Sequence, residues 1–378
     1  MIRLIEVSHC IIDTSDVPSC VITETSGRRP SRSLGTGGLS GMSSISRRNF
    51  IVSTAAALAF SLSAPAWSQE NPQIEFLYSP FADYAPFFVA KELGYFDEFG
   101  LDVTLSPKSG TAETIQMLAS GNVVSGAATW GAGLFNSINS GATVTIVATL
   151  AKMPDTVPSP SPLMVSEQAW RDGIRDVKDL KGKRVGIPGP GGFGLYSVAK
   201  ALEKGGLTVD DVEAIYLPPP ATAAAFANGG LEAGWSIEPF ALQLEKEGLG
   251  RRLVEDHTFG TELGFIAFNN EFAVENEDAV VNFLAAFLKA ARQLDNGGWQ
   301  DEKILDIVSE YTGTEKETLK GIAYTIRSED GSIDLTSVRE QEEFFRERGA
   351  LEYEGPIDIE SVYRTDLLEK ANALLAQQ

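Results

Sequence analysis

A glycine-rich bend after a short predicted strand is the part of this chain best suited to hold a ligand. The predicted strand Val185–Pro188 runs into the bend GPGGFG (residues 189–194), which opens a predicted helix. Unpaired backbone N–H groups at a helix start attract small polar or anionic groups. The bend therefore predicts a cradle for a solute, with Gly191, Gly192 and Phe193 as candidate contacts.

The bend also matches G-x-G-x-x-G, the fingerprint of dinucleotide-binding folds. Such a fold needs an acidic residue at the end of its second strand to bind the ribose hydroxyls. Here the next predicted strand, Glu213–Leu217, runs into three prolines, and Asp210 and Asp211 come before it. Solute binding is therefore favoured, and nucleotide binding is the alternative.

Side chains for catalysis are few. Of the two histidines only His257 lies beyond residue 68, in a polar loop where we expect it to be solvated, and both cysteines, Cys10 and Cys20, lie before that point. No G-x-S-x-G, H-E-x-x-H or phosphate-loop pattern occurs. We expect no catalytic residues, no metal site and no cofactor.

The elements that must position the bend alternate between strand and helix, which favours an α/β fold with mostly parallel sheets. The predicted strands are Ile74–Tyr78, Asp102–Leu105, Val123–Ala128, Thr143–Leu150, Leu163–Ser166, Val185–Pro188, Glu213–Leu217 and Arg252–Glu255. The predicted helices are Ala85–Leu93, Thr111–Ala119, Gly131–Ser140, Leu195–Leu202, Ala221–Asn228, Phe240–Glu247, Asp278–Leu294, Glu302–Tyr311, Glu315–Ile326 and Ser361–Ala376.

Proline-rich and strand-like segments divide this pattern into two lobes. Four prolines in Pro154–Pro162 preclude a regular element, and we interpret them as the first crossing between lobes, with Phe265–Phe268 as the return crossing. The first lobe is expected over 72–157 and 263–378, ending in an acidic helical tail, and the second over 158–262. Two crossings form a hinge that permits closure around a ligand.

The N-terminal residues 1–68 read as an export leader. Ser46–Phe50 carries a twin-arginine pattern, the apolar run Ile51–Leu62 follows, and small residues predict cleavage near Ser68. The run is well below the ~20 residues of a membrane-spanning helix, so we predict a periplasmic protein that is not integral to the membrane. An ordinary secretory signal is the alternative, and translation from Met42 is a further hypothesis.

The charge of the chain excludes one class of partner. It has 52 acidic and 31 basic residues, a formal net charge of −21. Such a surface repels nucleic acid and anionic lipid headgroups. It does not exclude anionic solutes, because a few backbone N–H groups can hold them locally.

Four blocks in the same order resemble the solute-binding proteins of ABC importers for aliphatic sulfonates, taurine, nitrate and thiamine-pyrimidine precursors. They are AKELGYF with GLDV, LASGN, DLKGKRVG and LPPPATAAAFANGGLEAGWSIEPF, within residues 74–270. The resemblance implies a type II periplasmic binding protein with two α/β lobes. It also implies a monomer that delivers a small solute to an ABC permease and its ATPase, without catalysis or cofactor. Asn122 departs from the family, which often has an acid there.

Ligands of α/β lobes bind beyond the carboxyl ends of the strands, and this rule nominates the residues that would contact the solute. The candidates are Phe81, Asp83, Tyr84, Ser109, Thr111, Thr129, Trp130, Gly191, Gly192, Phe193, Ser236 and Glu238. We expect aromatic rings to stack on the solute, Asp83 to orient a donor and Glu238 to make the main charged contact. The alternatives are a surface turn at Asp83, helix capping at Ser109 and Thr111, core packing of Trp130, and a hinge or cap role for Glu238.

The nominated segments contain two acids and no arginine, which favours an amine-bearing or heteroaromatic solute, although a sulfonate held by N–H groups remains open. Two other functions compete with uptake. One is a sensor that signals to a membrane kinase. The other is an enzyme similar to a fungal pyrimidine synthase, which relies on histidine and cysteine residues that this chain lacks beyond residue 68, His257 excepted.

Overall fold

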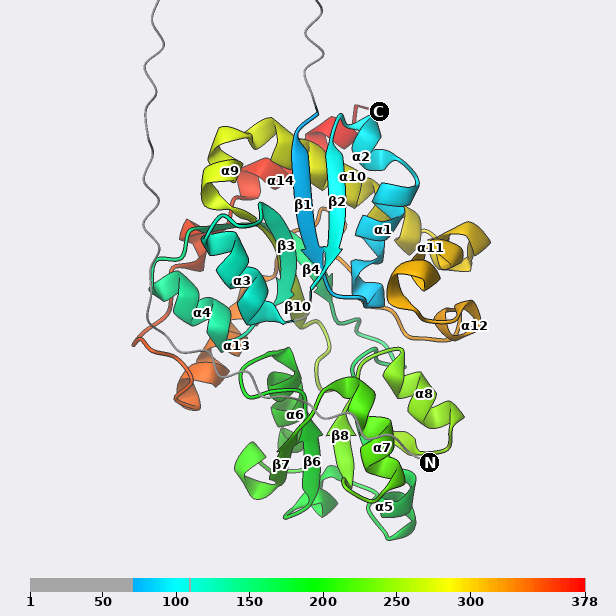
Figure 1. The fold of residues 1–378 in the computed structure, drawn as a ribbon. Coiled ribbons are helices and arrows are strands. Elements are labelled where there is room, and N and C mark those ends of the chain that lie inside the picture. The colour runs from blue at the N-terminus through cyan, green and yellow to red at the C-terminus, as the bar shows by residue number, and fades with distance from the viewer. Residues whose placement is uncertain (1–70, 109, 378) are drawn as a thin grey trace, which may run out of the picture. The chain divides into compact units, whose positions relative to one another are not determined.

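The computed structural model describes residues 71–108 and 110–377. The predicted leader, its cleavage point and the candidate Ser109 lie outside the described residues. Residues 69–378 form one compact unit, and its two sheets each anchor one lobe (Figure 1). No helix of the described ranges is long and apolar enough to cross a membrane.

The sheet of the first lobe has five strands in the order β2-β1-β3-β10-β4. β1 pairs in parallel with β2 and β3, whereas β10 is antiparallel to both of its neighbours, β3 and β4. The strand bounds are β1 Gln73–Tyr78, β2 Asp102–Pro107, β3 Ser125–Thr129, β4 Val144–Lys152 and β10 Glu262–Asn269.

The sheet of the second lobe repeats this plan in the order β7-β6-β8-β5-β9. β6 is parallel to β7 and β8, and β5 is antiparallel to β8 and β9. The strand bounds are β5 Leu163–Ser166, β6 Arg184–Ile187, β7 Glu213–Tyr216, β8 Ala233–Trp235 and β9 Gly250–Val254. In each sheet the reversed strand is the one that follows a crossing between the lobes.

The predicted α/β architecture with two lobes is confirmed, and the position of the return crossing is corrected. Phe265–Phe268 lies inside β10, paired with β3 and β4 of the first lobe. The chain therefore crosses back before Glu262. A run of buried apolar residues suits the centre of a sheet as well as a crossing, so the sequence pattern alone did not distinguish them.

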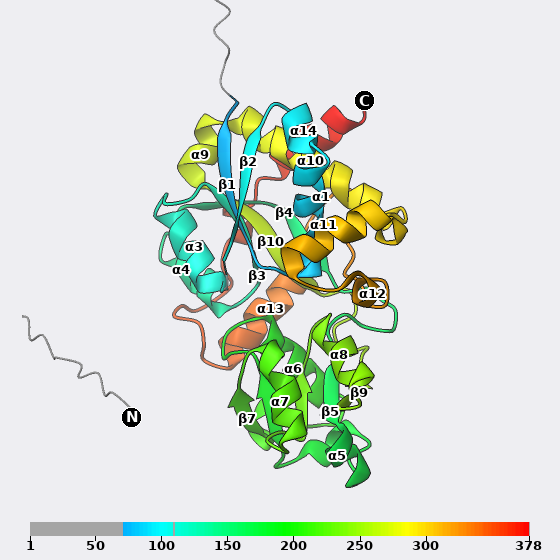
Figure 2. The ribbon, with the colours of Figure 1, turned by 45° about the vertical axis from the view of Figure 1, so that its right-hand side comes forward.

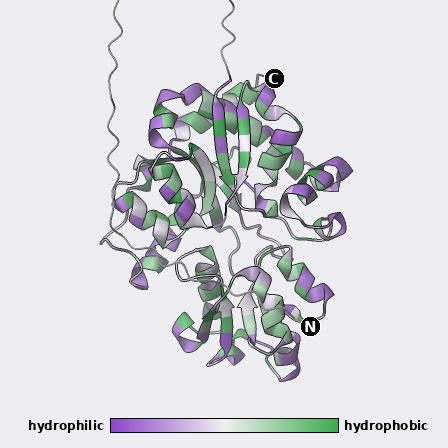
Figure 3. Ribbon diagram, in the orientation of Figure 1, coloured by the Kyte–Doolittle hydropathy of each residue, from purple (hydrophilic) through white to green (hydrophobic). Residues whose placement is uncertain are grey.

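Helices flank both sheets, and most begin within two residues of their predicted starts. Their bounds are α1 Ala85–Glu92, α2 Tyr95–Glu98, α3 Thr111–Ala119, α4 Ala132–Asn139, α5 Glu167–Arg171, α6 Phe193–Glu203, α7 Thr222–Ala227, α8 Phe240–Lys246, α9 Asn270–Glu275, α10 Glu277–Asp295, α11 Glu302–Thr312, α12 Lys316–Leu319, α13 Leu335–Glu347 and α14 Thr365–Leu375. Figure 3 shows hydrophobic and hydrophilic residues on the same helices, and on the long helix α10 the buried residues are the apolar ones.

Stacked phenylalanines fix α1 and α10 against the first sheet. The ring of Phe76 on β1 lies 4.1 Å from that of Phe87 and 5.5 Å from that of Phe283, and Phe87 also stacks on Phe287 at 4.8 Å. All four side chains are fully buried. This core holds β1, and therefore the loop after it, in place.

The segment after α11 differs from its prediction. The predicted helix Glu315–Ile326 ends at Leu319, in α12, and the backbone of Ile326 exchanges two hydrogen bonds with Lys152 at the end of β4 (2.8 and 2.9 Å). The exposed edge of β4 offers unpaired backbone groups, and Gly321 is a poor helix former. Pairing with the sheet edge therefore replaces the helix.

The C-terminal segment packs on the first lobe and also reaches the second. Val362 and Arg364 hydrogen-bond to Ile146 on β4 (2.7 and 2.9 Å). Figure 2 shows α13, part of the tail expected to be helical, beside α6 of the second lobe. Phe344 on α13 contacts Tyr196 on α6 at 5.4 Å between ring centroids.

Candidate functional site

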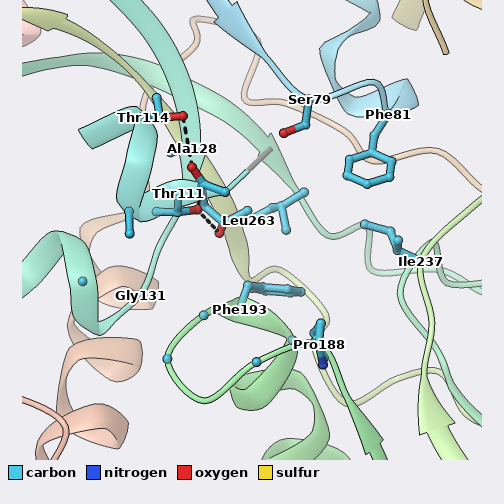
Figure 4. Close-up of a pocket in the computed structure, with 18 of the residues that line it drawn as sticks. Ser79, Phe81, Thr111, Thr114, Ala128, Gly131, Pro188, Phe193, Ile237 and Leu263 are labelled. Carbon is cyan, nitrogen blue, oxygen red and sulfur yellow. Dashed lines mark hydrogen bonds between the residues drawn. The ribbon is translucent and has the colours of Figure 1, made fainter. Parts of the chain in front are cut away.

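A cavity of 640 Å³ lies between the two lobes, where the carboxyl ends of four strands meet. Its wall includes Ser79, directly after β1, and Thr129 at the end of β3. From the second lobe it includes Pro188, directly after β6, and Trp235 at the end of β8. Figure 4 shows side chains of both lobes around this space. The cavity therefore lies at the strand ends from which the candidate contacts were nominated.

Three helix starts lie in the wall of this cavity. α3, α4 and α6 begin after Gly110, Gly131 and Gly192, and the first turn of each contributes lining residues. None of the three N-cap residues makes a side-chain capping hydrogen bond. The first N–H groups of a helix have no partner within the helix, and the helix dipole adds positive charge there. The cavity therefore has an electropositive wall without a cationic side chain.

Four helices away from the cavity start with a side-chain cap, whereas α1, α2, α7, α8, α10, α12 and α14 start without one. Ser166, Asn269, Asp301 and Asp334 each accept a backbone N–H at the start of α5, α9, α11 and α13. In such a cap a side-chain oxygen accepts a hydrogen bond from a backbone N–H that has no partner within the helix. Glycine at the starts of α3 and α6 supplies no side-chain acceptor for their first N–H groups, which leaves those donors available to a solute. At the start of α4 the Ala132 N–H instead donates to the Gly191 carbonyl at 2.9 Å.

Hydroxyl groups supplement the backbone donors in the first lobe. The hydroxyls of Thr111 and Thr129 lie 2.9 Å apart, and the Thr129 N–H donates to Thr111 Oγ1 at 3.3 Å. The Thr114 hydroxyl donates to the carbonyl of Gly110 at 3.2 Å, as Figure 4 shows beside the Thr111 pair. This hydroxyl pair links the start of α3 to the end of β3.

Most of the remaining wall is apolar. Phe81 and Leu263 come from the first lobe, and Phe193, Trp235 and Ile237 from the second. The indole Nε1 of Trp235 donates to Ser161 Oγ at 2.8 Å, so its polar atom is already satisfied. These side chains suit the hydrocarbon part of a solute.

Asp83 contributes a carboxyl group to the wall and is itself buried. Its Oδ1 accepts the Thr325 hydroxyl at 2.7 Å, and Arg327 donates to its backbone carbonyl at 2.5 Å. Burial raises the pKa of Asp83, while the Thr325 hydrogen bond and the Arg327 charge oppose the rise. The neighbouring Tyr84 directs its hydroxyl to the carbonyl of Ala127 at 3.2 Å, so only part of its side chain faces the cavity.

Glu238 is engaged elsewhere, and the structure does not place it in the cavity wall. Its carboxylate forms an ion pair with the buried Arg252 and accepts the Leu242 N–H at 3.1 Å. Arg252 also donates to Glu245 (3.0 Å) and to the carbonyl of Ser159 in the first crossing (2.7 Å). The surroundings of Glu238 therefore agree with the alternative interpretation, a hinge or cap role, better than with a contact to the ligand.

Two further candidates lie in the protein core. Trp130 is fully buried, and its ring lies 4.8 Å from that of Phe265 and 6.2 Å from that of Phe135. Ser236 is also fully buried, and neither residue lines the cavity. The lining candidates are Phe81, Asp83, Tyr84, Thr111, Thr129, Gly191, Gly192 and Phe193.

His257 is buried rather than solvated, which corrects the sequence-based expectation. Its Nε2 lies 2.9 Å from the hydroxyl of Ser197 on α6, and burial lowers its pKa to about 4. The imidazole is therefore neutral at physiological pH. The pair lies outside the cavity wall and has no third group that orients the ring. Within the described residues there is also no cluster of acidic, histidine or cysteine side chains that could hold a metal ion.

Sequence reasoning missed several lining residues. Ser79 directly follows a predicted strand and Pro188 is the last residue of another, so a stricter use of the strand-end rule would have included them. Leu150 and Leu263 lie on β4 and β10, and no local signal distinguishes them from other core leucines. Their place in the wall depends on the pairing of β10 between β3 and β4.

The two lobes touch through their backbones at one edge of the cavity. The Ala132 N–H donates to the carbonyl of Gly191 at 2.9 Å. A Cβ atom on Gly131 would lie 2.4 Å from the same Gly191 oxygen. Glycine at this position is therefore required for the observed approach of the lobes.

Comparison with known proteins places these features in a family context. The NMT1/THI5-like family model matches residues 82–295, more than half of the chain. A Bacillus subtilis (strain 168) protein whose name refers to binding of aliphatic sulfonates is 31% identical over 208 residues. That match covers 53% of this chain and 59% of the relative, so the chain spans less than two thirds of it.

Solved structures with the same fold include binding proteins and an enzyme. The alkanesulfonate-binding protein SsuA of Xanthomonas axonopodis pv. citri, bound to MOPS, has a TM-score of 0.62 at 18% identity, covering 78% of this chain and 99% of its own. The nitrate-binding protein NrtA of Synechocystis PCC 6803 has a TM-score of 0.65 at 19% identity, covering 82% and 90%. The desulfurization enzyme DSZB has a TM-score of 0.60 at 14% identity, covering 80% and 99%.

The placement of Glu238 leads to a prediction about stability. Glu238→Gln should lower the free energy of unfolding by about 1–3 kcal/mol, because it removes the charge that compensates the buried Arg252. Glu245→Gln is the matched control: Glu245 is partly exposed, so its loss should cost less than about 1 kcal/mol. Urea denaturation of both variants measures the difference, and equal losses would contradict the assignment.

Glu262, beside the lining residue Leu263, leads to a prediction about pH. Its carboxyl accepts the Thr149 hydroxyl (2.7 Å) and the Asp334 N–H (3.0 Å), and burial raises its pKa to about 7. Since the unfolded value is about 4.3, the folded state binds the proton more tightly. The stability that this proton contributes is full below pH ~4.3 and is lost as pH rises to ~7.

Glu262→Gln should therefore flatten this part of the pH profile. Relative to the variant, the wild type should lose up to about 2–3 kcal/mol between pH 5 and pH 8, since one pKa unit corresponds to about 1.4 kcal/mol. Denaturation at pH 5, 6, 7 and 8 measures the difference between the two proteins at each pH. Parallel profiles would show that Glu262 ionises normally.

Proposed function

Since the chain belongs to the NMT1/THI5-like family, we propose that it is the solute-binding component of an ABC importer. It captures a small organic solute in the cavity between its lobes and delivers it to a membrane permease and its ATPase. Export to the periplasm by the N-terminal leader is part of the proposal. The sulfonate-related name of the Bacillus subtilis relative and the binding proteins that share the fold support it.

The observation that carries the proposal is the set of uncapped helix starts in the cavity wall. They provide N–H donors from both lobes, as a sulfonate or carboxylate requires. The lining residues include no lysine or arginine. An anionic head would therefore bind through backbone donors and the hydroxyls of Thr111 and Thr129.

The amine-bearing solute that the sequence favoured has weaker support. It depended on two acids, Asp83 and Glu238, and Glu238 is paired with Arg252. An anionic head group such as a sulfonate is now preferred. A pyrimidine precursor with several hydrogen-bonding atoms is the second candidate, because Asp83 still offers an acceptor in the wall.

An enzymatic function has little support in the residues. Residues 71–377 contain no cysteine nucleophile, and the fold neighbour that is an enzyme, DSZB, is only 14% identical to this chain. The Ser197–His257 pair is buried away from the cavity wall. A sensor that uses the same cavity to signal to a membrane kinase remains an alternative that binding assays do not distinguish from uptake.

Ligand binding tests the head group directly. The purified protein should be stabilised against heat by ethanesulfonate, benzenesulfonate or another organic sulfonate, and not by NAD. A ligand at a hundred times its dissociation constant adds about 2.7 kcal/mol, which moves the melting midpoint by several degrees. Stabilisation by an aminopyrimidine alone would favour the second candidate. Stabilisation by NAD alone would contradict the receptor function.

Gly131→Ala tests whether binding requires the lobes to close. The added methyl group would meet the Gly191 carbonyl, so the variant should remain open and bind a sulfonate at least tenfold more weakly. Gly133→Ala is the control for closure, because a Cβ at that position meets no atom within 4 Å. Small-angle scattering with and without the sulfonate compares the two. Ligand-induced compaction of Gly131→Ala would contradict the hinge mechanism.

A further inference from the structure

The volume of the cavity is large for the smallest solutes that an anion-binding site could take. Its 640 Å³ would hold about twenty water molecules at ~30 Å³ each. A nitrate ion or a two-carbon sulfonate would displace only a few of them. Pockets of about 300–1,000 Å³ bury ligands of drug-like size. A cavity of this volume therefore suits a solute that has a large part beyond its anionic head group, which we call its body.

Aromatic side chains from both lobes face this space. Figure 4 shows Phe81 extending from the first lobe and Phe193 lying along the second-lobe side. The exposed fractions of Phe193, Trp235 and Ile237 are 2%, 8% and 6%, so most of each side chain packs within the second lobe and a small part borders the cavity. Flat apolar groups on two sides suit a ring, because aromatic pairs prefer stacked or edge-to-face contacts.

The aromatic wall is held in position by its neighbours. A Cβ on Gly194 would lie 2.1 Å from Pro188 Cγ and 3.5 Å from the Trp235 ring. Phe81 contacts Phe240 on α8 of the second lobe at 6.4 Å between centroids. These contacts with neighbouring residues oppose movement of the Trp235 and Phe81 rings into the space that a small solute would leave empty.

We infer that the solute is an organic anion with an aromatic or alicyclic ring system, such as a bicyclic sulfonate or carboxylate. This inference rests on the proposed function, which supplies the binding of the anionic head by the helix starts. The ring system occupies the space between Phe81, Phe193, Trp235 and Ile237. The protein then distinguishes among solutes by the size and apolar character of the body rather than by the head group.

A matched series of sulfonates tests the inference by calorimetry on the full-length protein. Ethanesulfonate, benzenesulfonate and naphthalene-2-sulfonate share a head and differ in the body. Affinity should rise along the series, by at least tenfold from the first to the last. Equal affinity for all three would overturn the inference and leave the proposed function standing. If none of the three sulfonates binds and 2-naphthylmethylammonium does, both the inference and the proposed binding of an anionic head group are overturned.

Two variants localise the ring. Phe193→Ala should reduce the affinity for naphthalene-2-sulfonate at least tenfold and change that for ethanesulfonate little. Ala112→Leu places a larger side chain at an exposed lining position on α3, where it cannot disturb the core. It should lower the preference for the bicyclic sulfonate, whereas Ala112→Ser should keep it. An unchanged preference in both Phe193→Ala and Ala112→Leu would place the ring elsewhere and overturn the inference.

Discussion

The guanidinium of Arg252, on a side chain that is 10% exposed, is the interaction that ties the first crossing to the second lobe. It joins the carbonyl of Ser159 in the first crossing to Glu238 and Glu245, and lies 3.5 Å from Glu255 at the start of the second crossing. A buried cation requires such complete pairing, because its desolvation is otherwise costly. The same guanidinium therefore holds both crossings and the turn that follows the cavity-lining Trp235.

The proposed anion site relies on backbone groups where other anion sites use cations. A backbone donor costs no side-chain entropy and stays fixed when the ligand is absent, and glycine allows the close approach that the lobes need at Gly131. Without a lining lysine or arginine, the electropositive character belongs to the fold itself.

Local patterns predicted the elements well because strands and helices carry their own periodicity. The strand Leu163–Ser166 and the helix Thr111–Ala119 have the predicted bounds, and the glycine bend lies in the cavity wall. The errors arose at side chains whose position depends on contacts with residues distant in the sequence. Glu238 has an ion-pair partner fourteen residues away, Trp130 packs on a strand of the returning chain, and His257 is covered by α6. Local sequence patterns do not predict any of these partners.

The place of β10 between β3 and β4 has a consequence for the order in which the chain acquires structure. All strands of the second lobe lie between Leu163 and Val254, so its sheet is complete as soon as that stretch is made. The first sheet lacks an inner strand until Glu262–Asn269 is available. Pairings over such long sequence separations form slowly. The sheet of the first lobe, whose strands come first in the chain, is therefore completed after the sheet of the second lobe. Until β10 pairs with them, the unpaired edges of β3 and β4 are the places where an incomplete chain is prone to aggregate.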